Sequence, residues 1–103
     1  MVAIVYSTTN NVQDARKIAH RLVEEQLVAC VNIIPNIESI YRWKGNVEEE
    51  SEFIILAKTV DKNIEKTIER IAQLHSYELP DIVVLPIIGG LKDYLDYIDT
   101  STT

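Results

Sequence analysis

Hydrophobic residues recur along the chain at two spacings, and the spacing changes wherever turn-forming residues intervene. The apolar run from Val2 to Ser7 predicts a strand, because it is short, rich in β-branched residues and followed by Thr and Asn residues that favour turns. Residues 12–23 then repeat apolar side chains at helical spacing behind Asn11, a good N-cap residue. This pattern predicts an amphipathic helix of about four turns.

The middle of the chain predicts two long strands joined by a tight turn. Residues 27–34 read LVACVNII, which is typical of a strand buried on both faces. Pro35 cannot donate a backbone hydrogen bond and therefore marks a bulge or an edge, after which residues 37–43 resume the strand. A Lys-Gly-Asn turn leads into residues 47–60, which start acidic and become apolar. We expect a hairpin arm with a solvated tip and a buried base.

The last third predicts a helix, a strand and a short final helix. Asp61 is a good N-cap for a second amphipathic helix, whose last turn carries His75. Residues 82–88 predict the fourth strand, and residues 91–98 a short terminal helix. The order βαββαβ plus a C-terminal helix predicts an α+β, ferredoxin-like split βαβ fold with an antiparallel sheet and both main helices on one face.

The length and the strand patterns together predict one domain and self-assembly. All 103 residues fit a single domain. Two helices cover one sheet face, yet residues 28–34, 53–57 and 82–88 are apolar at both alternations. A large exposed apolar patch is unusual on a monomer, so we expect a homo-oligomer that packs sheet against sheet. A charge at Ile33 or Ile55 should then break the oligomer or abolish folding.

Composition and charge narrow the partners and the compartment. The net charge of −6 repels phosphate backbones, which argues against nucleic acid and anionic membranes as partners. The N-terminal apolar run is too short for a signal peptide or a membrane span, and the lone Cys30 cannot form an internal disulfide. We therefore expect a soluble, cytoplasmic protein.

Catalytic motifs are lacking, which argues against an enzyme. The chain has no G-x-S-x-G elbow, no Walker loop and no H-E-x-x-H pair, and His20 is expected on the outer side of the first helix. Acylphosphatase-like chemistry on this fold would require an arginine after the first strand, where YSTTNN has none. RNA recognition would require aromatic residues on both central strands and a basic surface, and neither is present.

Four ordered stretches of sequence resemble the CutA divalent-cation-tolerance family. They read LVACVNIIP, SIYRWKGNVEEESEFIILAKT, HSYELPDIVVLPI and DYLDYI, and the resemblance runs from about Ile4 to Ile98. It implies a ferredoxin-like protomer in a tight homotrimer, shaped like the PII signalling proteins, with clefts between subunits. It also implies association with copper and other divalent ions, a cytoplasmic role in metal tolerance, and no established catalytic activity.

The resemblance implies only part of a copper site. Members with a copper site have a cysteine at the end of the first strand and a His-His pair at the end of the second main helix. Here these positions are Ser7 and Leu74-His75, so His75 is the one candidate ligand for Cu²⁺. An imidazole suits copper and zinc, but a histidine at a helix C-terminus is also a favourable partner for the helix dipole.

The family's clefts suggest further candidate residues and an alternative function. Tyr41 and Trp43 share a strand face, where they line a cleft or pack across an interface. The alternative is a PII-like signalling or scaffold trimer whose clefts bind a small anionic metabolite or a partner protein. That site would use Lys58, Tyr77 and the backbone around Ser7.

Two other groups of residues each have two interpretations. Cys30 lies in an apolar run, where a free cysteine is a small buried hydrophobe unless its sulfur reaches a cleft and binds Cu(I). Alternation places Glu48, Glu50 and Glu52 on one face and Glu49 on the other. These carboxylates either gather divalent cations or protect an exposed strand from aggregation.

Overall fold

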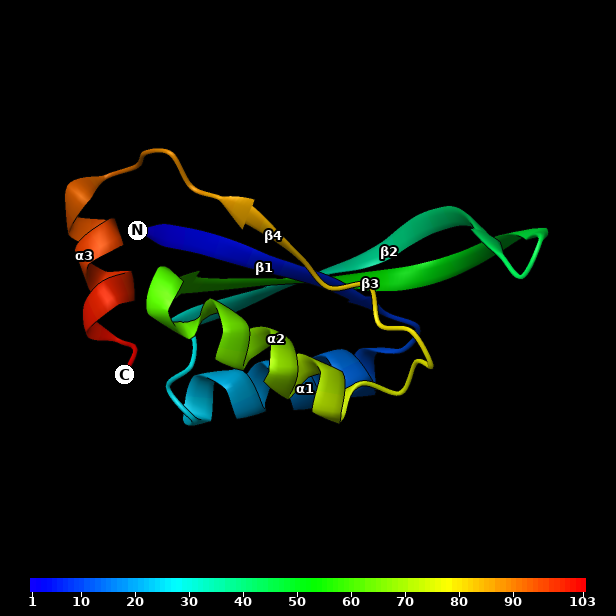
Figure 1. The fold of residues 1–103 in the computed structure, drawn as a ribbon, viewed down its shortest axis with the longest axis horizontal. Coiled ribbons are helices and arrows are strands. Elements are labelled where there is room, and N and C mark those ends of the chain that lie inside the picture. Colours follow the sequence, from blue (N-terminus) through cyan, green and yellow to red (C-terminus); the bar gives the residue numbers. More distant parts are fainter.

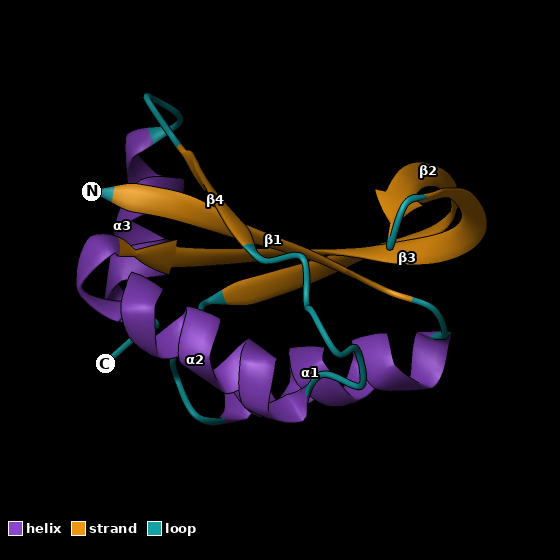
Figure 2. Cartoon of the chain, turned by 45° about the vertical axis from the view of Figure 1, so that its right-hand side comes forward, coloured by secondary structure: helices purple, strands orange, loops and turns teal.

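The computed structural model describes all residues from Met1 to Thr103 as one sheet covered by helices. The elements are β1 (Val2–Thr9), α1 (Val12–Glu24), β2 (Cys30–Trp43), β3 (Asn46–Val60), a 3₁₀ turn η1 (Asp61–Asn63), α2 (Ile64–Leu74), β4 (Val83–Pro86) and α3 (Lys92–Thr100). The strands are antiparallel in the order β2-β3-β1-β4. Helices α1 and α2 lie on the same side of the sheet, and α3 lies at the end of β1 that carries the N-terminus (Figure 1, Figure 2). The predicted α+β, ferredoxin-like fold is confirmed.

The hydrophobic core fills the space between the sheet and helices α1 and α2. Its fully buried members come from two strands, two helices and the segment after α1, and they are Val5, Ala15, Ile18, Leu22, Val28, Ile55, Ala57 and Ile71. Helix α1 begins as predicted, because the side chain of Asn11 accepts a hydrogen bond from the backbone N–H of Asp14 at 2.8 Å. Burial of these apolar side chains is the main source of the fold's stability.

A bulge in β2 decides which side chains of the hairpin arm reach the open face of the sheet. Ile34 pairs with Ile54, but Ile37 pairs with Glu52, so Pro35 and Asn36 lie opposite a single β3 residue. Asn36 has a φ of 59°. Paired residues share a face, so the extra residue moves the odd-numbered residues beyond the bulge to the side away from the helices. The prediction that Pro35 marks a bulge or an edge is confirmed in both respects, since β2 is also an edge strand.

The hairpin ends in the predicted turn at Lys44 and Gly45. Both residues have positive φ, 50° and 84°, as a two-residue connection between twisted strands requires. The exposed Lys44 also lies 3.8 Å from Glu78, so the tip of the arm meets the segment between α2 and β4.

Several predicted boundaries were wrong. The second strand begins at Cys30 rather than residue 27, and within one chain it is covered on the helix side only, since Ile34 is 40% exposed on the other side. The fourth strand covers only Val83–Pro86. Asp61 does not cap α2, because its carboxylate accepts the neighbouring Lys62 N–H and a 3₁₀ turn precedes the helix.

The helices leave one sheet face open, and its β4 side exposes large apolar side chains. Val83 and Leu85 of β4 are 53% and 46% exposed there. Ile55 is instead fully buried and Ile33 packs against the same core, so both belong to the helix-covered side. A charge at either position would disrupt the core, so of the two expected outcomes the structure favours loss of folding over loss of assembly. No helix is long and apolar enough to cross a membrane.

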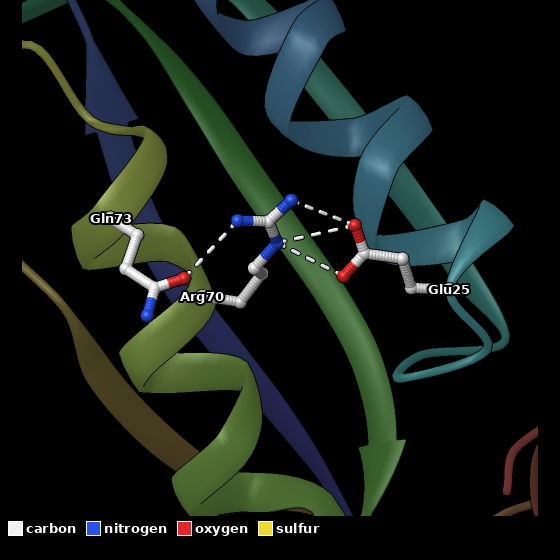
Figure 3. A network of polar contacts seen from close by, with 3 residues as sticks. All are labelled: Glu25, Arg70 and Gln73. Carbon is white, nitrogen blue, oxygen red and sulfur yellow. Dashed lines mark hydrogen bonds and ion pairs between the residues drawn. The ribbon is translucent and has the colours of Figure 1, made fainter.

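A bidentate ion pair joins α2 to the end of α1. Figure 3 shows the guanidinium of Arg70 donating to both carboxylate oxygens of Glu25, at 2.8 to 3.2 Å, and to Gln73 Oε1 at 3.1 Å. These hydrogen bonds lower the pKa of Glu25 and raise that of Arg70. The pair fixes the second helix against the first at their solvent-facing side.

Candidate functional site

A cavity of about 540 Å³ lies on the open face, where the hairpin arm, β1 and the segment between α2 and β4 meet. Its size is within the range of small-molecule sites. Four aromatic side chains line it, and they are Tyr6 of β1, Tyr41 and Trp43 of β2, and Tyr77 of the segment after α2. They include the only tryptophan and three of the five tyrosines in the chain, so aromatic residues are concentrated at this site.

Carboxylates dominate the charged groups of the same cavity. The acidic lining residues are Glu50, Glu52, Glu78 and Asp81, against one basic residue, Arg42. The guanidinium of Arg42 donates to the carbonyl oxygen of Gly45 at 3.4 Å, and Glu78 is paired with Lys44. The remaining three carboxylates form no ion pair, so the cavity attracts cations.

Glu52 is the most deeply placed of these carboxylates. It is 6% exposed, and its Oε2 accepts hydrogen bonds from Tyr77 Oη at 2.5 Å and from Thr8 Oγ1 at 3.1 Å. Its Oε1 accepts none within the chain and is not sealed from solvent. Glutamates are seldom buried without a cationic partner, because desolvation of the charge is costly. An anionic Glu52 is therefore stabilised mainly by a phenol.

Thr8 links the end of β1 to the segment that carries Tyr77. Its backbone N–H donates to Asp81 Oδ1 at 3.3 Å, and its hydroxyl lies 2.5 Å from Asp81 Oδ2. A threonine hydroxyl has one proton, so it donates to either Asp81 or Glu52 at any moment. The two carboxylates thus compete for this donor.

His75 ends α2 with both ring nitrogens occupied. Its Nδ1 accepts the backbone N–H of Tyr77 at 3.1 Å, so the proton of the neutral ring is on Nε2, which donates to the carbonyl oxygen of Thr8 at 2.7 Å. The ring also packs against Tyr77, with centroids 4.5 Å apart. His75 therefore positions Tyr77 over the cavity, and a metal at Nε2 would have to replace the bond to Thr8.

The phenols of the cavity remain protonated well above neutral pH. The pKa of Tyr77 is raised, first by burial and then by its hydrogen bond to Glu52. Burial and the charges of Asp81 and Glu52 raise the pKa of Tyr6, and burial and the charge of Glu50 raise that of Tyr41. Hydroxyl donors, rather than phenolates, therefore face a ligand here.

Three of the predicted cleft residues come together, and two do not. Tyr41, Trp43 and Tyr77 all line the cavity. Ser7 is fully buried on the helix-covered face, where its Oγ has no hydrogen-bond partner. Lys58 lies about 20 Å along β3 from Glu52, and its Nζ donates to Tyr94 Oη at 3.1 Å. Neither Ser7 nor Lys58 lines this cavity, and their predicted place in a cleft between subunits stays a prediction.

The remaining predicted residues fall in separate places. Cys30 is half-buried within one chain, with its Sγ 3.9 Å from Asn32 Oδ1. Of Glu48, Glu50 and Glu52, which alternation placed on one face, Glu50 and Glu52 line the cavity, and neither Glu48 nor Glu49 does. No three His, Cys, Asp or Glu residues are placed to hold a metal ion within one chain.

Sequence reasoning missed Tyr6, Thr8 and Asp81. The alternation of β1 contained a usable signal, since Tyr6 and Thr8 lie on the opposite face from the buried Val5 and Ser7. Asp81 had no such signal, because its contact with Thr8 joins residues 73 positions apart.

Comparisons with known proteins agree along the whole chain. The family model described as CutA1 divalent ion tolerance protein matches residues 3–101. The divalent-cation tolerance protein CutA of Thermus thermophilus is 46% identical over 99% of each chain, and a solved Thermus structure covers 100% of both with a TM-score of 0.96. A CutA structure from Xylella fastidiosa has 35% identity and a TM-score of 0.96, covering 99% of this chain and 98% of that one. The chloroplastic CutA of Arabidopsis thaliana is 40% identical over 96% of this chain, which spans 54% of that longer protein.

Proposed function

The chain belongs to the CutA1 divalent-ion-tolerance family, and we propose that it serves divalent-cation tolerance as a non-enzymatic homotrimer that binds divalent ions, Cu²⁺ among them. The observation that carries the proposal is the acidic cavity on the open sheet face. Three carboxylates there, those of Glu50, Glu52 and Asp81, lack a cationic partner within the chain. Carboxylate oxygens and imidazole nitrogens both bind divalent metals.

Assembly follows from the open face of the sheet. Val83 and Leu85 expose large apolar side chains there, next to the cavity end of β1. A subunit packed on this face would remove them from water and would approach the cavity at the same time. This arrangement supports a complete site that contains ligands from two subunits.

His75 is the nitrogen ligand that we propose for copper. Its Nε2 is the nitrogen that faces the carbonyl oxygen of Thr8, and the backbone N–H and hydroxyl of the same threonine contact Asp81. Binding would exchange the hydrogen bond of Nε2 for a metal bond, while Nδ1 keeps the Tyr77 backbone N–H as a second contact that orients the ring.

Calorimetric titration tests the proposal directly. Cu(II), with Zn(II) for comparison, is added to the size-verified oligomer, to His75→Ala and to His20→Ala, the exposed histidine of α1. We expect about one ion per subunit and at least a tenfold loss for His75→Ala, about 1.4 kcal/mol, with no loss for His20→Ala. No binding to the wild type contradicts the proposal, and equal losses in both variants contradict the role of His75.

An anionic metabolite fits this cavity less well than a cation does. Its lining contains four carboxylates and one guanidinium, and Lys58 is occupied by Tyr94 at the other end of β3. We also propose a cytoplasmic location, which fits the unpaired Cys30. The chloroplastic CutA of Arabidopsis thaliana and the periplasmic CutA of Archaeoglobus fulgidus make other compartments the alternative. Cell fractionation tests this location.

A further inference from the structure

We propose that the aromatic cavity binds a protonated amine, with its ammonium group against Glu52 and its apolar body between the aromatic side chains. This ligand class goes beyond divalent cations, because the aromatic side chains that line the cavity are not ligands for a divalent metal ion. The inference starts from the composition of the lining, in which Tyr41, Trp43 and Tyr77 face a volume of about 540 Å³. Faces of aromatic rings attract cations that have given up part of their hydration.

Glu52 provides the charge at the inner end of the site. This carboxylate is 6% exposed and has no lysine, arginine or histidine partner. Its Oε1 accepts no hydrogen bond within the chain, and Glu52 lines the cavity. A buried carboxylate of this kind is stabilised by a cation that enters the cavity.

The hydrogen-bond inventory favours an N–H donor over a cation without one. The single proton of the Thr8 hydroxyl cannot satisfy both Asp81 Oδ2, at 2.5 Å, and Glu52 Oε2, at 3.1 Å. The Tyr77 hydroxyl supplies one further donor, to Glu52. The two carboxylates therefore have more acceptor sites than there are side-chain donors in contact with them. An ammonium group would supply three N–H donors.

The architecture of the hairpin is consistent with a site built for a small molecule. The bulge at Pro35 and Asn36 moves Tyr41 and Trp43 to the face that carries Glu52. An exposed ion pair between Lys44 Nζ and Glu78 Oε2, 3.8 Å apart, joins the tip of the arm to the segment after α2. Neither feature is required for the helix-side core.

The test uses a small amine and its uncharged counterpart. n-Butylammonium, n-butanol and butyrate are titrated at neutral pH into the size-verified oligomer with EDTA present, so that divalent ions play no part. Binding is followed by calorimetry and by the fluorescence of Trp43, the only tryptophan, which lines the cavity. We expect millimolar or tighter binding of butylammonium only, with a change in Trp43 emission.

Two charge variants of equal net charge identify the site. Glu52→Gln keeps the shape of the side chain and an acceptor for Tyr77, and it should weaken amine binding at least about tenfold. Glu65→Gln, at an exposed position of α2, should not change it. If Glu52→Gln fails to fold, Asp81→Asn replaces it and should weaken binding as well.

Three outcomes overturn the proposal. One is equal binding of butanol and butylammonium, and another is undiminished binding by a folded Glu52→Gln variant. The third is no amine binding by the oligomer, which would mean that a neighbouring subunit or the cavity's own side chains fill the space. None of these outcomes affects the divalent-ion titration, so the two proposals fail separately.

Discussion

Nε2 of His75 donates a hydrogen bond of 2.7 Å to the carbonyl oxygen of Thr8, which ties the end of α2 to the end of β1. The second ring nitrogen accepts the backbone N–H of Tyr77. One side chain thus determines where the segment after α2 crosses the sheet, and that segment supplies a wall of the cavity. In the protein without a ligand, His75 therefore holds the segment after α2 in place through its two hydrogen bonds.

Replacement of His75 by alanine should therefore cost stability as well as metal affinity. Two partly buried backbone groups lose their partner, and each lost hydrogen bond is worth about 1 kcal/mol. We expect His75→Ala to lower the free energy of unfolding by about 2 kcal/mol in urea titrations. His20→Ala, on the exposed side of α1, should change it by less than about 0.5 kcal/mol. Equal stability of the two variants would contradict the bridging role.

Tyr77 should make stability decrease with pH in the alkaline range. Its pKa is raised in the folded protein above the unfolded value of 10.0, so the folded state retains a proton that the unfolded state loses. The contribution is fully present below pH 10 and declines as the pH rises from 10 towards the folded pKa. Urea unfolding of the wild type and Tyr77→Phe between pH 8 and about 11 measures this difference.

Tyr77→Phe should also lower the free energy of unfolding at neutral pH. Loss of the hydroxyl leaves buried Glu52 with one donor fewer, which should destabilise the fold by about 1–3 kcal/mol. The stability gap between wild type and variant should narrow above pH 10, because only the wild type loses the Tyr77 contribution there. A gap that stays constant up to pH 11 would contradict the raised pKa.

The sequence predicted the elements well where the signal was local. Asn11 predicts the start of α1 by its capping chemistry, and Gly45 predicts the hairpin turn because glycine readily adopts a positive φ. The faces of the hairpin arm were harder to predict. Pro35 indicates a bulge but does not show how many residues it contains, and that number decides which face Trp43 occupies.

The candidate site was predictable only in part for a similar reason. Tyr77 and His75 are two positions apart in the sequence, so the sequence alone predicts that they lie close together. Asp81 and Thr8 meet only through the antiparallel pairing of β4 with β1, which no local pattern encodes. Ser7 is a candidate only through the family resemblance. The alternation of β1 places its side chain on the helix-covered face, away from the cavity.

The Glu25–Arg70 pair should stabilise the fold at neutral pH and cease to do so in acid. Hydrogen bonds from Arg70 hold the pKa of Glu25 below its unfolded value of 4.5. The contribution is therefore present above pH 4.5 and lost as the pH falls through the folded pKa. Arg70→Lys keeps the charge but loses the bidentate geometry, so it should unfold at lower urea than the wild type at pH 7.

The acid condition separates the ion pair from ordinary packing. At pH 3 the urea midpoints of the wild type and Arg70→Lys should lie closer together than at pH 7. The reason is that protonated Glu25 carries no charge and no longer forms the bidentate ion pair with the guanidinium. Gln73→Ala serves as a control, since it removes the neutral neighbour of Arg70 and should show no such pH dependence. An equal difference in urea midpoint between the wild type and Arg70→Lys at both pH values would mean that packing, not the ion pair, causes the effect.

The open sheet face gives the sharpest test of assembly. Leu85 of β4 is 46% exposed on the face away from the helices, and Val23 of α1 is 42% exposed elsewhere. A lysine at Leu85 would be buried in a sheet-to-sheet contact, whereas one at Val23 stays in water. We expect Leu85→Lys to be a folded monomer, or a much weaker oligomer, in light scattering with unchanged circular dichroism, while Val23→Lys remains assembled. A fully assembled Leu85→Lys protein would mean that subunits meet elsewhere, and dissociation of both variants would point to net charge rather than to this face.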